Sequence, residues 1–184
     1  MEQSLSPIKF NYDFTTLAVM NTGHSIQVNY EPGSSIEING QTYNLLQFHF
    51  HDPSEHTING IKYPLELHLV HQNSTGQFAV VGILIEEGES HPLIEALWSY
   101  LPQELGEIKL NNLRLNVSAF LPENQSFYHY QGSLTTPPCS EGVNWYVFQT
   151  PIQMSTSQIE QFHQLYDHNA RPVQPLNNRQ IQQN

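Results

Sequence analysis

The chain has 184 residues, of which 17 are acidic and 6 are basic, so its formal net charge is −11. This length predicts one domain, and the acidic balance argues against nucleic acid or an anionic membrane as a partner. The sequence contains no run of 18 apolar residues and only one cysteine. It therefore excludes a membrane-spanning helix, an internal disulfide framework and a multi-cysteine metal site.

Short runs of alternating, β-branched or aromatic residues predict a domain dominated by β-strands with peripheral helices. Turn sequences separate these runs, and Asn39-Gly40 is a strong hairpin signal. In chain order, strands are expected at Ile8–Tyr12, Ser25–Tyr30, Ser35–Ile38, Gln41–His51, Leu65–His71, Phe78–Glu86, Leu115–Ala119, Phe127–Gly132 and Val143–Thr150. The periodicity does not determine the order of the strands in a sheet.

Two segments have the periodicity of amphipathic helices. Ser90 is expected to cap the first, and Ser155 with Gln158 has the capping-box spacing at the start of the second. Each helix carries an apolar stripe that is typical of packing against a core. The stripe residues are Leu93, Ile94, Leu97, Trp98 and Leu101 in the first helix, and Ile159, Phe162 and Tyr166 in the second.

The predicted strand Gln41–His51 ends in Gln47-Phe48-His49-Phe50-His51. Because successive side chains of a strand point to opposite faces, Gln47, His49 and His51 share one face, and the phenylalanines share the face toward the core. Two imidazoles on a stiff apolar strand are a preorganised pair of nitrogen ligands. This pattern alone is weak evidence for a metal site.

A second strand repeats the arrangement, because Glu66 precedes His68 by two residues and shares its face. If the two strands are neighbours, His49, His51 and His68 converge. Three neutral imidazoles leave a tetrahedral Zn²⁺ with one open position, as in catalytic zinc sites. Gln47 and Glu66 then lie where they can accept ring N–H bonds. The alternative, a set of hydrogen-bonded core histidines, does not explain these two polar residues.

These motifs, together with several others in the same order, resemble the α-class carbonic anhydrases of bacteria and cyanobacteria. The resemblance covers nearly the whole chain. The matching segments are Asn21-Thr22-Gly23-His24, Gln47–His51, Ser54-Glu55-His56-Thr57, Glu66–His71, Ser133-Leu134-Thr135-Thr136-Pro137-Pro138 and Arg171–Arg179.

The resemblance implies a mainly β (α+β) fold with a central twisted, mostly antiparallel sheet and Zn²⁺ at the foot of a cone-shaped cleft. It implies that His49, His51 and His68 are the zinc ligands. It also implies which groups orient them: Gln47 for His49, Glu66 for His68 and the backbone carbonyl of Asn169 for His51.

The implied reaction is the reversible hydration of CO₂ to bicarbonate and a proton by zinc-bound hydroxide, with inhibition by sulfonamides or anions. Thr135 would accept the proton of the hydroxide and donate its own to Glu55, Thr136 would help to hold bicarbonate, and His24 would export the proton. The apolar wall for CO₂ would consist of Val70, Val80, Leu134, Val143 and Trp145.

The resemblance also has departures. Family members begin with an aromatic-rich segment before the first matched strand, whereas the match here starts near Pro7, so residues 1–184 are expected to form one domain that is short at its N-terminus. Exposed apolar surface, weaker stability and lower activity are then expected, and a homo-oligomer is one way to cover that surface. Cys139 matches a cysteine that pairs with the N-terminal segment in bacterial relatives, so a free thiol is expected rather than an intermolecular cross-link.

The family resemblance implies export to the periplasm or the cell exterior. Met1–Leu5 lacks the basic and apolar regions of a signal peptide, so the cytoplasm stays an alternative.

Two functions other than CO₂ hydration are also open. A cupin-type metalloprotein would use the His-x-His pair with Glu55 as a ligand, and an anhydrase-like scaffold would bind a partner without catalysis.

Overall fold

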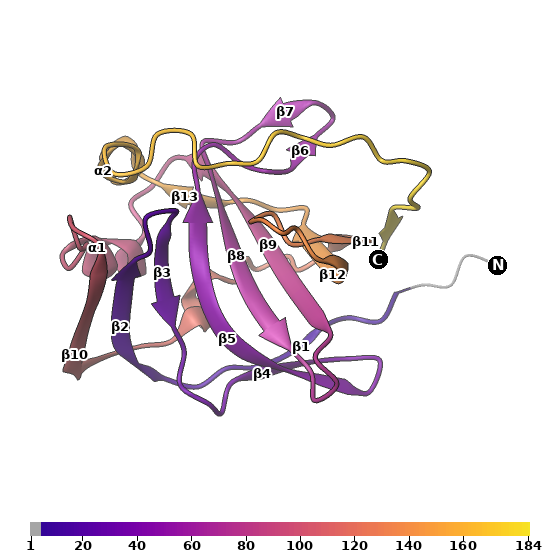
Figure 1. Cartoon of the computed structure of the whole chain (residues 1–184), viewed down its shortest axis with the longest axis horizontal. Coiled ribbons are helices and arrows are strands. Elements are labelled where there is room, and N and C mark those ends of the chain that lie inside the picture. Colours follow the sequence, from indigo (N-terminus) through magenta and orange to yellow (C-terminus); the bar gives the residue numbers. More distant parts are fainter. Residues whose placement is uncertain (1–4) are drawn as a thin grey trace.

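One large twisted sheet dominates residues 5–184, which the computed structural model describes (Figure 1). Its strands are β1 (Lys9–Asn11), β2 (Thr15–Asn21), β3 (Ile26–Asn29), β4 (Ser35–Ile38), β5 (Gln41–His51), β8 (Leu65–Gln72), β9 (Phe78–Glu87), β10 (Gly106–Leu115), β11 (Phe127–Ser133), β12 (Glu141–Phe148), β13 (Ile152–Met154) and β14 (Gln182–Gln183). A separate hairpin is formed by β6 (Thr57–Ile58) and β7 (Ile61–Lys62), and the helices are α1 (Pro92–Trp98), the 3₁₀-helix η1 (Val117–Phe120) and α2 (Thr156–His163).

The main path through the sheet is β10-β2-β3-β5-β8-β9-β12-β11-β14. All pairs are antiparallel except those of β9 with β12 and with β13, so the expected mostly antiparallel sheet is confirmed. Asn39 and Gly40 have φ values of 50° and 76° and join β4 to β5, which confirms the expected hairpin. No helix among residues 5–184 has the length and apolar character needed to cross a bilayer.

The core lies against one face of the central strands. Phe48 and Phe50 of β5 are fully buried there and pack edge-on against Phe120 of η1. Phe50 also contacts Trp98 of α1 and Phe162 of α2. The helices and η1 thus seal the face that carries the phenylalanines, which leaves the histidines of β5 on the other face.

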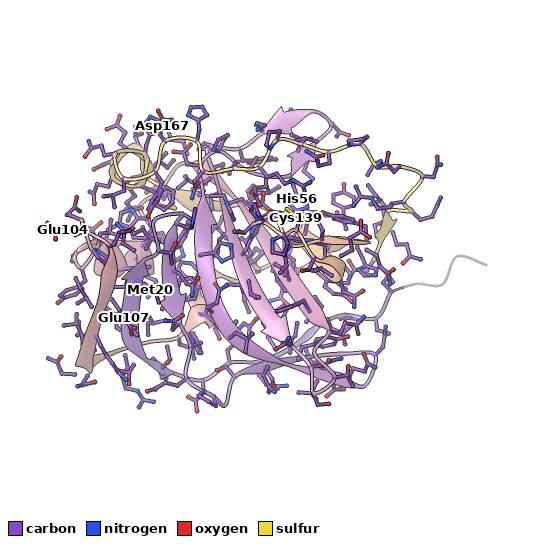
Figure 2. The ribbon with its side chains drawn as sticks, in the orientation of Figure 1. Met20, His56, Glu104, Glu107, Cys139 and Asp167 are labelled. Atoms are coloured by element: carbon purple, nitrogen blue, oxygen red, sulfur yellow. The ribbon has the colours of Figure 1, made fainter. Side chains whose placement is uncertain are left out.

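The chain end covers part of that other face. After α2, the polypeptide runs without regular structure along the ends of the central strands before β14 pairs with β11 (Figure 1). His56 and Cys139 lie over the central strands in Figure 2, whereas Glu104 and Glu107 lie at the outer edge beside β10. Cys139 is the sole cysteine of the chain, and its side chain is partly buried.

The expected strand at Leu115–Ala119 is wrong. β10 ends at Leu115 and η1 follows at Val117, because the side chain of Asn116 accepts the backbone N–H of Ser118 and caps the new helix. The strands β2 and most of β10 were not expected from the sequence. Their residues are mixed in polarity, and β10 is largely exposed, so neither shows a clean alternation.

The start of the first helix also differs from the expectation. His91 rather than Ser90 is the N-cap residue, although its side chain makes no capping hydrogen bond, and Pro92 occupies the first turn, where its missing N–H costs nothing. The capping box of Ser155 and Gln158 in α2 is confirmed. Leu101 and Tyr166 lie beyond the ends of the two helices, although both still pack against the core.

A partly buried tyrosine–histidine pair connects the N-terminal segment to the central sheet. The hydroxyl of Tyr12 donates to Nε2 of His71 at 2.7 Å, and Nδ1 of His71 donates to the carbonyl of Ala79. The two rings are stacked. Burial lowers the pKa of His71 to about 4, so the ring is neutral and its Nε2 is an acceptor.

We predict that Tyr12→Phe lowers the free energy of unfolding by about 1–2 kcal/mol, because it leaves Nε2 of His71 buried without a donor. Urea denaturation at pH 7 measures the change. Tyr100→Phe is the control, because the side chain of Tyr100 is 37% exposed. An equal loss in the two variants would contradict a specific role of the Tyr12 hydroxyl.

Candidate metal centre

Three histidines converge on the face of the sheet opposite the phenylalanines. β5 and β8 are antiparallel neighbours, and their register places His49 directly opposite His68. One nitrogen of each of His49, His51 and His68 lies within 4.8 Å of the others. The condition under which the three histidines converge, that these two strands are neighbours, is therefore met, and the result is a compact cluster of three possible nitrogen ligands.

The nitrogen of each ring that faces away from the cluster donates a hydrogen bond. Nδ1 of His49 donates to Gln47 at 2.8 Å, Nδ1 of His51 donates to the carbonyl of Asn169 at 3.2 Å, and Nε2 of His68 donates to Glu66 at 2.9 Å. These contacts determine the tautomers. They leave Nε2 of His49 and His51 and Nδ1 of His68 with lone pairs that face one another.

The protonation states suit a cation in this position. Burial, with the neighbouring His51 and His68, holds the pKa of His49 well below its usual value. Burial and His68 lower the pKa of His51 to about 4. Both imidazoles are therefore neutral near pH 7. A set of three imidazole donors with hydrogen-bonded outer nitrogens fits Zn²⁺.

The carboxylate of Glu66 lies beneath the cluster and is fully buried. Oε2 accepts the backbone N–H groups of Glu55 and His56, each at 2.8 Å, and Oε1 accepts His68 and, at 2.6 Å, Nδ1 of His56. Burial alone would raise the pKa of Glu66, but His56 and His68 more than offset this and hold it well below its usual range. Gly82 leaves room for this carboxylate, since a Cβ there would lie 2.9 Å from Oε1.

His56 had no assigned role from the sequence, although it stands in a quoted motif. Its Nε2 bonds the hydroxyl of Tyr130 at 2.6 Å while Nδ1 bonds Glu66. Burial lowers the pKa of His56, but the charge of Glu66 outweighs burial and the net shift is upward. The proximity of His56, Glu66 and His68 thus reflects a hydrogen-bonded network that holds His68 in place.

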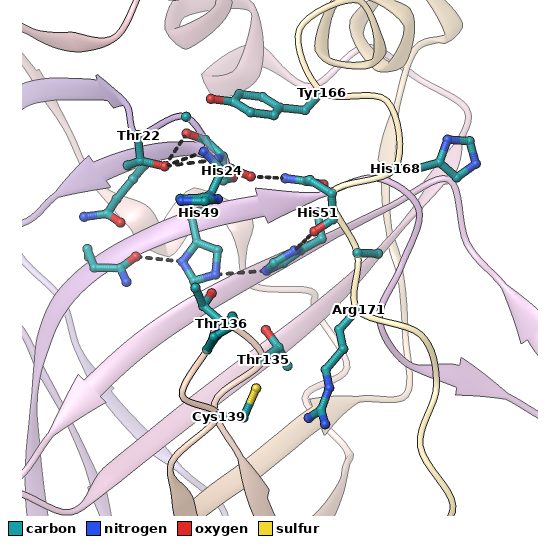
Figure 3. A pocket seen from close by; sticks show the side chains of 17 residues that line it. Thr22, His24, His49, His51, Thr135, Thr136, Cys139, Tyr166, His168 and Arg171 are labelled. Carbon is teal, nitrogen blue, oxygen red and sulfur yellow. Dashed lines mark hydrogen bonds between the residues drawn. The ribbon is translucent and has the colours of Figure 1, made fainter.

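A cleft of about 620 Å³ leads to the cluster from the surface (Figure 3). His49 and His51 lie at its floor, His24 and Tyr166 on one wall, and Thr135 and Thr136 on the opposite wall. The structure therefore brings His24, Thr135 and Thr136 to the same cleft as two of the three histidines. His68 is buried behind them.

Glu55 is buried beside the cluster, and its two oxygens differ. Oε1 accepts the backbone N–H of Arg171 at 2.8 Å, whereas Oε2 has no hydrogen-bond partner among residues 5–184. Oε2 lies 3.9 Å from Nδ1 of His68. Thr135 makes no hydrogen bond to Glu55 in the described part of the chain, so the expected contact between them is not formed here.

The residues expected to form an apolar wall belong to one cluster. Val70, Val80, Val143 and Trp145 are buried together, and Leu134 packs against them. Trp145 lies edge-on to His68, with 4.8 Å between the ring centroids. None of the five lines the open cleft, so the cluster lies deeper than the walls that bear His24 and the threonines.

Several cleft residues had no assigned role from the sequence. Tyr166 was expected only as a core residue, and Arg171 and Cys139 were quoted without a function, yet all three line the cleft. Asp52, which directly follows His51, contributes through its backbone. Its backbone N–H donates to the side chain of Asn169 at 2.7 Å, which helps to hold the carbonyl that orients His51.

Comparisons with known proteins agree on one family. A family model described as eukaryotic-type carbonic anhydrase matches residues 1–184. A carbonic anhydrase of Nostoc sp. (strain PCC 7120 / SAG 25.82 / UTEX 2576) is 47% identical over 172 residues, which cover 93% of this chain and 65% of that protein. The chain thus spans about two thirds of the length of this curated relative.

Two solved structures are similar over almost the whole chain. A hyperthermostable carbonic anhydrase from a hydrothermal vent chimney has a TM-score of 0.95 and 46% identity, and the match covers 100% of this chain and 82% of that one. The α-carbonic anhydrase of Thermovibrio ammonificans, in complex with the inhibitor sulfanilamide, has a TM-score of 0.93 and 41% identity, with 98% and 80% covered.

We predict that the purified chain binds one equivalent of Zn²⁺ at pH 7, because burial keeps His49 and His51 neutral there and leaves the lone pairs of their Nε2 atoms free for the metal. Equilibrium dialysis with metal analysis measures the binding, and circular dichroism verifies that the chain is folded. A folded chain that binds no zinc at pH 7 would contradict the protonation states described above.

Proposed function

The chain belongs to the eukaryotic-type, or α-class, carbonic anhydrase family, and we propose that residues 1–184 form one domain that catalyses the reversible hydration of CO₂ to bicarbonate and a proton. One observation carries this proposal. Three ring nitrogens converge at the foot of an open cleft, and a separate hydrogen-bond acceptor holds each ring from behind.

The proposed cofactor is Zn²⁺, held by Nε2 of His49, Nε2 of His51 and Nδ1 of His68. When bound, Zn²⁺ lowers the pKa of a coordinated water to about 7 and so supplies a nucleophile at neutral pH. The orienting contacts of Gln47, Asn169 and Glu66 keep the three lone pairs directed at one point, so the ligands need little reorganisation to bind the metal.

Thr135 and Glu55 are proposed to orient the attacking water. Oε2 of Glu55 is buried and has no donor among residues 5–184, and Thr135 and Glu55 line one pocket, so the hydroxyl of Thr135 is the donor that we propose for it. With its proton committed to Glu55, the Thr135 oxygen can only accept. The water must then donate to Thr135, which directs a lone pair toward the substrate.

The remaining roles follow from polarity. CO₂ is uncharged and suits the apolar cluster of Val70, Val80, Leu134, Val143 and Trp145 beside His68. The polar product is proposed to contact Thr136 on the cleft wall, where it meets solvent. His24 lies exposed at the cleft, where its imidazole is proposed to pass the proton on to solvent.

Inhibitor binding and location belong to the same proposal. The Thermovibrio ammonificans relative is complexed with sulfanilamide, and we expect sulfonamides and small anions to enter the corresponding cleft here. A periplasmic or extracellular location rests on the family resemblance. The cupin alternative does not agree with the family and the fold of this chain. The other alternative, a non-catalytic scaffold, is distinguished from an enzyme by a CO₂ hydration assay.

Stopped-flow CO₂ hydration with parallel zinc analysis is the decisive test. The zinc-loaded chain should hydrate CO₂ above the buffer rate and be inhibited by sulfanilamide. His68→Ala should lose zinc and lower the rate at least about 100-fold, because even outer partners of ligands contribute 10–100-fold. His91→Gln, which lies at the start of α1, is the matched histidine control. A zinc-loaded, folded chain without activity would favour the scaffold.

Replacement of Thr135 separates orientation from metal binding. Thr135→Ala should retain one equivalent of zinc but lower kcat by about 100-fold, because the attacking water loses its direction. Thr135→Ser keeps a hydroxyl and should recover most of the rate. If Thr135→Ala hydrates CO₂ as fast as the parent chain, the proposed role of Thr135 is wrong.

A further inference from the structure

The outer side of β10 is an open sheet edge. β10 is the terminal strand of the large sheet and pairs only with β2 among residues 5–184. The pairing is regular from Gly106 to Leu110 and then shifts in register before Arg114. A strand edge presents unpaired N–H and C=O groups that can form a ladder with another chain. The regular part of this edge is five residues long.

The side chains on this edge are unusually accessible. Ile108 is 37% exposed, although Val19, its partner on β2, is fully buried, so Ile108 forms the rim of the core. Leu105, directly before the strand, is 74% exposed. Figure 1 shows β10 at the outer side of the sheet with no element beyond it. An added strand would continue the sheet and cover Ile108.

The charges on this edge are complementary to those on the same edge of a second copy of the chain. Glu107 and Lys109 lie two residues apart and so point to the same face. In an antiparallel pair related by a two-fold axis at Ile108, Glu107 faces Lys109 of the partner subunit, and Lys109 faces Glu107 of the partner subunit. The two copies of Ile108 meet on the other face. Opposite charges in directly opposed positions stabilise strand pairs, and like charges destabilise them.

Both charges are available for such contacts. Neither Glu107 nor Lys109 forms an ion pair within the described part of the chain. Lys109 has a longer-range interaction instead: hydrogen bonds from Thr16, together with the charges of Lys109 and Arg114, lower the pKa of Glu31. The chain has only six basic residues against a net charge of −11, and β10 carries two of them, Lys109 and Arg114. This concentration of positive charge reduces the local repulsion between two acidic copies.

We propose that Gly106–Leu110 is a self-association edge, through which two copies of this chain form a symmetric antiparallel dimer with a sheet that continues across both. The contact is isologous, so it closes at two copies, and the register shift after Leu110 ends the ladder. Five paired residues bury less than a standard interface, so the dimer is weak and depends on protein concentration.

Sedimentation equilibrium of the whole chain between about 10 μM and 1 mM tests this proposal in the range expected for a small interface. A reversible monomer–dimer equilibrium is expected. Glu107→Lys and Lys109→Glu each convert both opposite-charge contacts into like-charge contacts, so each should raise the dimer Kd roughly tenfold or more. The double exchange, Glu107→Lys with Lys109→Glu, should restore the parent Kd.

A mixture of the two single variants provides the sharpest readout. One variant carries two lysines on the edge and the other carries two glutamates, so a mixed dimer regains two opposite-charge contacts. Equal amounts should therefore associate more strongly than either variant alone. The controls Glu123→Lys and Lys62→Glu make the same changes in net charge at other exposed positions and should leave the Kd unchanged.

Three results would overturn the proposal: a monomer over the whole concentration range, a dimer whose Kd responds equally to the control variants, or a mixture that associates no better than its components. Far-UV circular dichroism of each variant verifies the fold before sedimentation. The measurement does not depend on catalysis, so it stands or fails separately from the proposed CO₂ hydration.

Discussion

The alternation of side chains along β5 is the constraint on which the site depends. Phe48 and Phe50 are fully buried against η1 and the helices, so their positions determine the register of the strand. A slip of one residue would expose both phenylalanines and bury the histidines in their place. The hydrophobic core therefore holds His49 and His51 on the cleft face, and pairing with β8 adds His68 opposite His49.

The site also depends on the buried negative charge of Glu66, which must be stabilised by hydrogen bonds. Glu66 is fully buried, and a buried carboxylate is costly unless it is well hydrogen-bonded. Four donors from His56, His68 and the backbone of residues 55 and 56 meet this need. The same contacts connect the ligand strand to the loop that carries Glu55. The orientation of His68 and the position of Glu55 therefore depend on one network.

Sequence reasoning was most accurate where packing and function impose the same pattern. The bounds of β5 and of β4 were predicted without error, and β8 and β9 to within one residue, because these strands are bounded by clear turns and combine apolar runs with a fixed polar face. It failed for β2 and β10. β10 is a largely exposed edge strand with little hydrophobic signal, whereas β2 is mostly buried but mixes polar with apolar residues, so in both cases the pairing partner defines the strand.

The sequence by itself determined the donor types and their faces, since the spacing of Gln47, His49, His51, Glu66 and His68 follows from the two-residue period of a strand. It also contained enough family motifs to indicate the fold. The resemblance also implied the contact of the Asn169 carbonyl with His51, which the structure forms across 118 positions of the chain. Only the tertiary structure decided that His49 and His68 are opposite one another and that His56 joins Glu66 to Tyr130. Contacts between distant segments depend on strand order and loop paths, and local periodicity carries no information about either.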